Sequence, residues 1–354
     1  MIWVLAIILS CTASAAVTAG CPGKAEALLT ASSLKATPIE ITTLLDAHRA
    51  RMSGGTSKIQ DAEKLNFIGT DSRDVYNSTS VFQTTFRGEK VDVLLGRTEE
   101  THRETGTEAI FYVKDGKVWK PLAGAPKFSI QDPFFSRVGN ELLVGGVETF
   151  EKPEGGLGYR TVFYRDLGQG IERLTRFAEG PYGMKDIRLV ALQDGQLLLL
   201  TRPQGNIGGR GKIGVSILKS LDSLNGDTIK AAPLIEGQFT DAEWGGANAA
   251  YLLDNGSVGV LGHIARYDTA GNRNYYPMAF TYNPRTGATS AMKILLERAD
   301  LPGGLTGKSK REDLKDVLFS GGLVRLPNGL AILYVGAGDA ELYRVTIPDP
   351  FRGL

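Results

Sequence analysis

One unit recurs along this chain: a polar or acidic motif, an apolar run, a glycine-containing turn and a second apolar run. Its five copies begin at Asp74, Gln131, Lys185, Glu243 and Lys315. Recurrence of a unit at intervals of roughly 50 residues or more is typical of folds assembled from equivalent neighbouring units. The repeat therefore limits the fold to architectures that contain five similar hairpins.

A turn signal separates the two apolar runs of every copy. The five signals are Arg87-Gly88, Gly139-Asn140, Asp194-Gly195, Asn255-Gly256 and Asn328-Gly329. Asn-Gly and Asp-Gly favour tight hairpins, and we expect both central residues to need positive φ. Further strand-like runs lie between the copies, for example over 109–122 and 278–295. The pattern predicts an all-β fold, a five-bladed β-propeller with four-stranded antiparallel blades, with one or two β-sandwiches as the alternative.

Charge composition excludes one class of partner. The 354 residues include 40 Lys and Arg against 39 Asp and Glu. A protein that binds nucleic acid or an anionic membrane surface needs a basic field, which this balance does not supply. The 44 glycines suit many short strands joined by tight turns. Nucleic acid and an anionic membrane surface are therefore not the expected partners, and the oligomeric state is not readable from one chain. The carbohydrate or glycoside partner that we expect rests on the acidic residues described below.

The N-terminal residues differ from the repeat. Residues 1–19 read as a signal peptide because a short apolar run precedes small residues, with an uncleaved anchor as the alternative. We expect a secreted chain, free of the membrane after cleavage, with an N-terminal extension over 20–60 and a propeller domain over 61–354. The extension contains a helix-compatible segment at 41–48. Only Cys11 and Cys21 are present, so no disulfide framework is expected after cleavage.

Each copy carries a carboxylate near the start of its first strand. These acids are Asp74, Asp132, Asp186, Glu243 and Asp316. In a propeller, equivalent strand starts converge at one mouth of the central channel, which would bring five carboxylates together. Glycoside hydrolysis needs such a set, since one carboxyl donates a proton and another activates water or attacks. The alternative is that each acid only caps a local turn.

Further candidate site residues are expected near these acids at the mouth of the channel. We expect them to bind substrate: Asn77, Lys185, Arg188, Arg202, Trp244, Asn248, His263, Tyr276, Asp316 and Asp339. The arginines could bind sugar hydroxyls or an anion, or could form a structural lattice with the acids. The aromatic residues could stack on sugars or pack between blades. Three dispersed histidines predict no transition-metal site, and a calcium ion on the acidic ring stays open.

Several runs resemble one family. They are MKDIRLVALQDGQLLLLTRPQG from Met184, GGRGKIG from Gly208, EWGGANAAYLLDNGSVGVLGHIA from Glu243, YYPMAF from Tyr275, and DVLFSGGLVRL with LYVGAGDAE in the last copy. They resemble the DUF1861 family over roughly residues 61–341. This resemblance implies the five-bladed furanosidase-like propeller superfamily, with the β-fructosidases, arabinanases and β-mannoside phosphorylases.

The resemblance also implies roles. Gln131-Asp132-Pro133-Phe134 resembles the Glu-Asp-Pro-Arg motif of the mannoside phosphorylases and mannosidases, with two flanking residues replaced. Arg202 and His263 match positions that help to hold phosphate in that group, and Asp339 matches its closing acidic motif. By the arabinanase and fructosidase pattern, Asp74 would be the general base and Glu243 the acid.

We expect a secreted inverting glycoside hydrolase. In it, Asp74 would activate water or orient the sugar, Asp132 would tune the site, Asp186 would assist and Glu243 would donate the proton. The first alternative is a glycoside phosphorylase that uses inorganic phosphate as co-substrate, with no other cofactor. The second is a carbohydrate-binding propeller without catalysis, because the fold hosts many functions.

Overall fold

The structure is a computed structural model that describes residues 37–54, 59–101, 103 and 106–352. The chain divides into residues 1–35 and residues 36–354, and the fold described below belongs to the second unit. The predicted signal peptide lies outside the described residues, so secretion stays a prediction. None of the described helices is long and apolar enough to cross a membrane.

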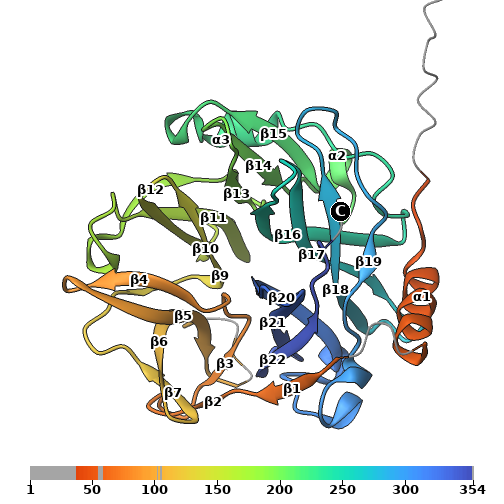
Figure 1. Cartoon of the computed structure of the whole chain (residues 1–354), viewed down its shortest axis with the longest axis horizontal. Coiled ribbons are helices and arrows are strands. Elements are labelled where there is room, and N and C mark those ends of the chain that lie inside the picture. The colour runs from red at the N-terminus through yellow and green to blue at the C-terminus, as the bar shows by residue number, and fades with distance from the viewer. Residues whose placement is uncertain (1–36, 55–58, 102, 104–105, 353–354) are drawn as a thin grey trace, which may run out of the picture. The chain divides into compact units, whose positions relative to one another are not determined.

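Antiparallel strand groups surround a common centre (Figure 1). The first group contains β3 (Asp74–Tyr76), β4 (Phe82–Phe86), β5 (Glu89–Glu99), β6 (Glu108–Asp115), β7 (Val118–Pro121) and β8 (Lys127–Phe128). The second contains β9 (Gln131–Val138), β10 (Glu141–Glu151), β11 (Leu157–Arg165) and β12 (Thr175–Glu179). The third contains β13 (Arg188–Ala191), β14 (Leu197–Thr201) and β15 (Gly214–Leu218), so it has three strands where four were expected.

Eight further strands form one sheet that has a narrow junction. One part contains β16 (Glu243–Leu252), β17 (Val258–Tyr267), β18 (Arg273–Tyr282) and β19 (Lys293–Ile294). The other contains β20 (Asp316–Arg325), β21 (Leu330–Ala337), β22 (Glu341–Pro348) and β1 (Asp61–Lys64). Only the parallel pairs Asn274 with Asp316 and Tyr275 with Val317 join the two parts. Divided there, the sheet gives a fourth and a fifth group, and each group contains one copy of the sequence unit.

The start of the chain joins the last group to the first. Strand β1 pairs antiparallel with β22, and β2 (Asn66–Phe67) then pairs parallel with β7. Buried apolar clusters lie between the first and second groups, the second and third, the third and fourth, the fourth and fifth, and the fifth and first. Since every group packs on both neighbours, the strands close into a ring. The all-β propeller prediction is confirmed.

Every predicted turn joins two antiparallel strands. Arg87 and Gly88 both have positive φ, at 52° and 84°. In the other four turns only the glycine of the pair is left-handed. The expectation of two positive φ angles was therefore wrong for those turns; three of them connect strands through longer loops in which one glycine suffices.

Helix α1 (Ile41–Ser53) confirms the helix-compatible segment of the extension. Its buried Ile41, Leu44 and Leu45 pack against the third and fourth groups. Short helices occupy the loops: α2 (Gly205–Gly208), α3 (Gly226–Lys230), η1 (Ile171–Arg173), η2 (Leu221–Ser223), η3 (Arg298–Asp300), η4 (Gly304–Thr306) and η5 (Glu312–Leu314). Helix α1 therefore packs onto the propeller's outer surface.

Candidate functional site

Four polar residues near the ends of inner strands have left-handed backbone conformations. Their φ angles are 43° at Asn77, 47° at Asp132, 58° at Asp186 and 51° at Asp339. Asn and Asp tolerate this region better than other residues with a Cβ, but the conformation still costs free energy and tends to occur at functional sites. Asn77, Asp132 and Asp186 each stand at the start of a blade. The first copy therefore contributes Asn77 at this position, three residues after the predicted Asp74.

A buried amide joins two carboxylates. The Asn77 Nδ2 donates to Asp132 Oδ1 at 2.9 Å and to Asp339 Oδ1 at 3.3 Å. Arg97, on β5, donates through Nη1 to the same Asp132 oxygen at 3.1 Å. The first group of the propeller therefore supplies both partners of an acid pair whose members come from the second and fifth groups. We call Asp132, Asp339, Asn77 and Arg97 the acid wall.

The pKa values of the two acids of this wall are shifted in opposite directions. Burial, together with the negative charge of Asp132, raises the pKa of Asp339 above its usual range. Burial alone would also raise the pKa of Asp132, but the charges of Arg97 and Lys185 hold it below its usual range. When two neighbouring carboxyls have pKa values shifted in opposite directions, the one with the higher pKa usually serves as the general acid and the other stays ionised. Of the two carboxyls, Asp339 is therefore the one that keeps its proton to the higher pH, and Asp132 is the one that ionises first.

Arg97 is held in place by a second set of charges. Its Nη2 donates to Glu99 Oε2 at 2.9 Å, and Glu99 also accepts hydrogen bonds from Lys310 and Thr107. All four side chains are buried. The sequence reading did not single out Arg97, Glu99 or Lys310. Arg97 and Glu99 alternate directly after the apolar run of residues 93–96 in β5, which is the signal that could have identified them.

Cationic groups surround the remaining inner acid. Asp186 Oδ2 lies 3.4 Å from Arg202 Nε and 4.0 Å from His263 Nε2. Burial would raise the pKa of Asp186, but the charges of Arg202 and Lys185 keep it below its usual range. Arg188 is buried as well; its guanidinium lies 4.1 Å from the Phe134 ring centroid, and burial lowers its pKa to about 10. We call Lys185, Asp186, Arg188, Arg202, Asn248 and His263 the cation wall.

Several buried polar atoms of these walls lack a hydrogen-bond partner. They are Arg202 Nη1, Asn248 Nδ2, Asp186 Oδ2 and Asn77 Oδ1. Buried polar atoms are nearly always hydrogen-bonded, and leaving one unpaired costs about 1–3 kcal/mol. Donors and acceptors are both present, so a ligand that carries both anionic oxygens and hydroxyl groups would satisfy the set. Sugars and phosphate are ligands of this kind.

His263 contributes a neutral ring. Burial lowers its pKa to about 3, so the imidazole is uncharged at neutral pH. Its Nδ1 lies 2.9 Å from Asn248 Oδ1, so Nδ1 carries the proton and Nε2 is left as an acceptor. That acceptor faces the Asp186 carboxylate, which also only accepts. A ligand hydroxyl between them would be able to donate to either.

The aromatic candidates separate into two environments. Tyr275 stacks on His263 with ring centroids 5.5 Å apart, and its hydroxyl accepts a hydrogen bond from Trp244 Nε1 at 3.0 Å. Tyr276 instead donates to Asp316 Oδ2 at 2.5 Å. Neighbouring strand residues point to opposite faces, which explains the difference. Tyr275, rather than the predicted Tyr276, is the tyrosine beside the cation wall.

Three of the predicted acids bind partners outside the two walls. Asp74 pairs with Lys308 and accepts from Thr101 at 2.7 Å. Glu243 accepts from the backbone N–H of Ile41 at 2.6 Å and of Thr240 at 3.2 Å. Asp316 accepts from Tyr276 and Asn274. The structure thus brings Asp132, Asp186 and Asp339 to the centre but gives Asp74, Glu243 and Asp316 other partners.

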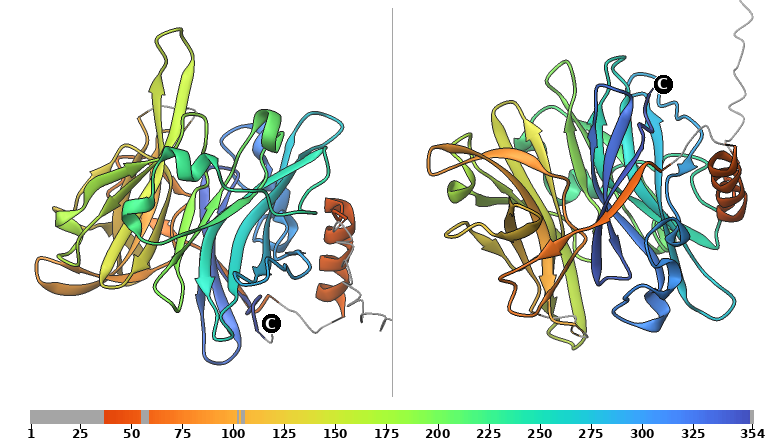
Figure 2. Two further views of the ribbon diagram at one scale, coloured as in Figure 1. Left: turned by 90° about the horizontal axis from the view of Figure 1, so that it is seen from above. Right: turned by 60° about the horizontal axis from the view of Figure 1, so that its bottom comes forward.

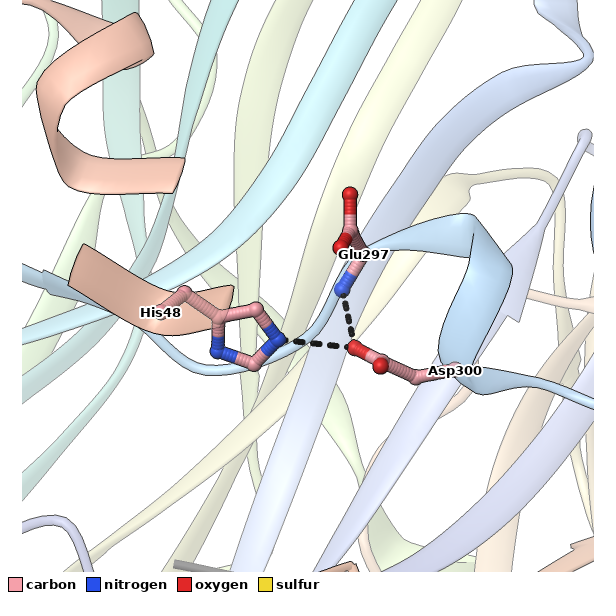
Figure 3. A group of neighbouring side chains, drawn as sticks. All are labelled: His48, Glu297 and Asp300. Carbon is pink, nitrogen blue, oxygen red and sulfur yellow. Dashed lines mark hydrogen bonds and ion pairs between the residues drawn. The ribbon is translucent and has the colours of Figure 1, made fainter. Parts of the chain in front are cut away.

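One group of side chains on the outer surface has the spacing of metal ligands: His48, Glu297 and Asp300 (Figure 3). Its atoms already have partners. Asp300 Oδ2 accepts from the Glu297 backbone N–H and lies 2.8 Å from His48 Nε2, while Arg49 binds the Glu297 carboxylate. Since a metal ion would have to displace these bonds, the group fits an anchor for α1 better than a metal centre.

The chain is similar to solved propeller enzymes of sugar metabolism. A mannose phosphorylase from Leishmania mexicana, solved in complex with a phosphate ion, is 30% identical, with 88% of this chain and 95% of that chain covered and a TM-score of 0.75. A GDP-Man-dependent mannosyltransferase from the same organism is 31% identical, with 87% and 95% covered and a TM-score of 0.75. A β-1,2-mannobiose phosphorylase from Listeria innocua shares the fold at 14% identity, with 82% and 91% covered and a TM-score of 0.53.

No curated protein matches the chain in sequence. Residues 52–353 match the family model described as protein of unknown function (DUF1861). That match includes nearly the whole propeller and both walls of the central site. The chain therefore belongs to the DUF1861 family.

Proposed function

We propose that this protein is a carbohydrate-active enzyme that transfers a mannosyl residue between a glycan hydroxyl and a phosphate oxygen, as a glycoside phosphorylase. The similar Leishmania proteins have phosphate-containing partners in common: a phosphate ion in one and GDP-Man in the other. We therefore expect this chain to bind a phosphate group as well.

The observation that carries the proposal is the unpaired, buried Arg202 Nη1 beside the neutral His263. Arg202 Nε is already bound to Gly245 O at 2.7 Å and Nη2 to Arg210 O at 3.3 Å, so the guanidinium is fixed in orientation. A fixed guanidinium with a free N–H is suited to a phosphate oxygen. Lys185 and Arg188 add positive charge around the same position.

The acid wall would serve the glycosidic bond. In phosphorolysis a phosphate oxygen forms a bond to the anomeric carbon while the bond from that carbon to the leaving oxygen breaks. The leaving oxygen takes a proton, which Asp339 can supply because its raised pKa keeps it protonated to a higher pH. Ionised Asp132, fixed by Asn77 and Arg97, would hold a sugar hydroxyl and stabilise positive charge at the ring.

Hydrolysis is the second candidate function. Asp186 is held ionised and its Oδ2 has no hydrogen-bond donor, which is also the condition of a carboxylate that accepts a proton from water. In that case Asp186, rather than Asp74, would be the base. Glu243 is a weak candidate for the acid because both of its oxygens accept backbone N–H groups.

The test compares mannose oligosaccharides with and without inorganic phosphate. A phosphorylase releases mannose 1-phosphate only when phosphate is present, and the reverse reaction lengthens an acceptor from mannose 1-phosphate. Parallel assays with GDP-mannose measure nucleotide-sugar transfer. Release of free mannose at the same rate without phosphate would identify a hydrolase, and no turnover in any assay would contradict catalysis.

A further inference from the structure

We propose a second sugar-binding subsite on the hairpin formed by β10 and β11, which would hold the distal residues of an oligosaccharide substrate. The proposal rests on the proposed function, because it names the substrate class as a chain rather than a single sugar. Figure 2 (left) shows this yellow-green hairpin projecting beyond the other strands. Val147 of β10 is the last residue that pairs with β9, opposite Gln131 and next to Asp132. The hairpin therefore extends past the strand end that carries the acid wall.

Two half-buried aromatic rings of the hairpin, Phe150 and Tyr159, lie beside the exposed ring of Tyr182. Phe150 and Tyr182 lie edge to face with centroids 5.4 Å apart. The Arg160 guanidinium lies 5.8 Å from the Phe150 centroid and 5.1 Å from that of Tyr182. Tyr182 is 72% exposed, the largest exposure among the large hydrophobic side chains of the described residues. We call Phe150, Tyr159, Arg160 and Tyr182 the aromatic platform.

The platform is rigidly built. Tyr182 lies in a turn fixed to β11, since Gly183 N donates to Tyr159 O at 2.8 Å and Thr161 N donates to Met184 O at 3.1 Å. Phe150 lies over Gly158, where an added Cβ would be 2.4 Å from the ring. Rings held in one orientation lose little conformational entropy when a ligand stacks on them.

A cavity accompanies the rings. Its volume is about 630 Å³, and its lining includes Phe150, Tyr159 and Tyr182 together with the polar Lys152 and Glu154. Apolar ring faces next to hydrogen-bonding groups match a pyranose, which has an apolar face and a rim of hydroxyls. The mixture of one Lys and one Glu gives no net charge that would favour an anionic ligand.

The aromatic platform is linked to the cation wall by a short stretch of chain and by hydrogen bonds. Tyr182 precedes Asp186 by four residues, so their Cα atoms are at most about 14 Å apart. Tyr159 donates to Gln204 Oε1 at 2.7 Å, and Gln204 and Arg202 both donate to Arg210 O. One short oligosaccharide could therefore contact the platform while its terminal residue lies between the two walls.

The experiment measures binding and turnover of mannobiose to mannohexaose, each linkage separately, for the full chain and Tyr182→Ala. We expect wild-type affinity to increase with chain length. In Tyr182→Ala we expect affinity for the longest chain to fall about tenfold, the equivalent of one lost stacking contact, with affinity for mannobiose unchanged. Leu305→Ala removes a different exposed apolar side chain, 55% exposed, and should change neither.

Turnover separates this proposal from the one on which it rests. If the enzyme is a phosphorylase, Tyr182→Ala should raise KM for the long chain and leave KM for phosphate and kcat unchanged. Length-dependent binding that is lost in Tyr182→Ala, without turnover in any assay, would support the subsite and contradict the phosphorylase. Affinity independent of chain length, or an equal loss for all lengths, would overturn the subsite.

Discussion

The two walls of the central site each contain a buried aspartate, but they differ in how that carboxylate is hydrogen-bonded. In the acid wall, Asp132 Oδ1 accepts hydrogen bonds from both Asn77 and Arg97. In the cation wall, Asp186 has ionic neighbours but no hydrogen bond to Oδ2, and positive side chains outnumber it. Compensated charges fix geometry, whereas uncompensated ones leave interactions available to a ligand. In the proposed phosphorylase, the acid wall would act on the leaving oxygen and the cation wall would bind the anion.

The largest effect is expected at the acid wall. Asp339→Asn keeps a side chain of the same shape but removes the proton, so kcat should fall by about 10²–10⁴-fold. The measurement is kcat for mannose oligosaccharide phosphorolysis, with circular dichroism to verify folding. Asp74→Asn removes a carboxylate that pairs with Lys308 outside the walls and should leave kcat near the wild-type value. Equal losses in both variants would contradict the division.

A smaller and different effect is expected at the cation wall. Arg202→Lys keeps the charge but loses the fixed N–H groups, so KM for phosphate should rise about ten- to hundredfold. KM for the oligosaccharide should change much less. The measurement is a phosphate titration at saturating oligosaccharide. If KM for both substrates rose together, Arg202 would be supporting the whole site rather than the anion.

The strands and turns that carry this site were predicted from the sequence better than the side chains that form it. The hairpin turns and apolar runs are local signals, and the strands lie where they indicated. Asp132 and Asp186 were also identified, because each lies near the start of the first strand of its copy. In the first copy Asp74 was predicted as the inner acid, whereas Asn77, which takes that position, was predicted only to bind substrate. A positive φ is not visible in a sequence, although Asn and Asp are the residues that tolerate it.

The partners of these residues could not be predicted in the same way. Asn77, Arg97 and Asp132 come from different strands, and their contacts depend on how neighbouring blades pack. Glu243 shows the converse, since it occupies the expected position in its copy but accepts the N–H of Ile41 at the start of α1. That role depends on a helix outside the repeat. A sequence repeat can therefore locate equivalent positions, but it does not show which of their side chains bind segments outside the repeat.

The walls should also differ in the sign of their pH effects on stability. The folded-state pKa of Asp339 is raised, so wild-type stability falls as pH rises from the ordinary Asp range through that value, and Asp339→Asn should abolish this fall. The folded-state pKa of Asp186 is lowered, so its contribution is present above the ordinary range and is lost as pH falls below it. Urea unfolding of both Asn variants between pH 3 and pH 7 measures the two slopes. Slopes of the same sign would contradict the assignment of protonation states.

The smallest effect is expected at Glu243, outside both walls. Glu243→Gln keeps one accepting oxygen but removes the negative charge at the N-terminus of α1, so the free energy of unfolding should fall by about 1 kcal/mol. Because no hydrogen bond joins Glu243 to either wall, kcat should stay within about twofold of wild type, whereas general-acid catalysis would require a loss of at least about a hundredfold. Glu40→Gln removes an exposed charge at the same helix end without removing a buried acceptor, and is the matched control. A large loss of kcat with unchanged stability would return Glu243 to the catalytic residues and would extend the acid wall to the fourth group of strands.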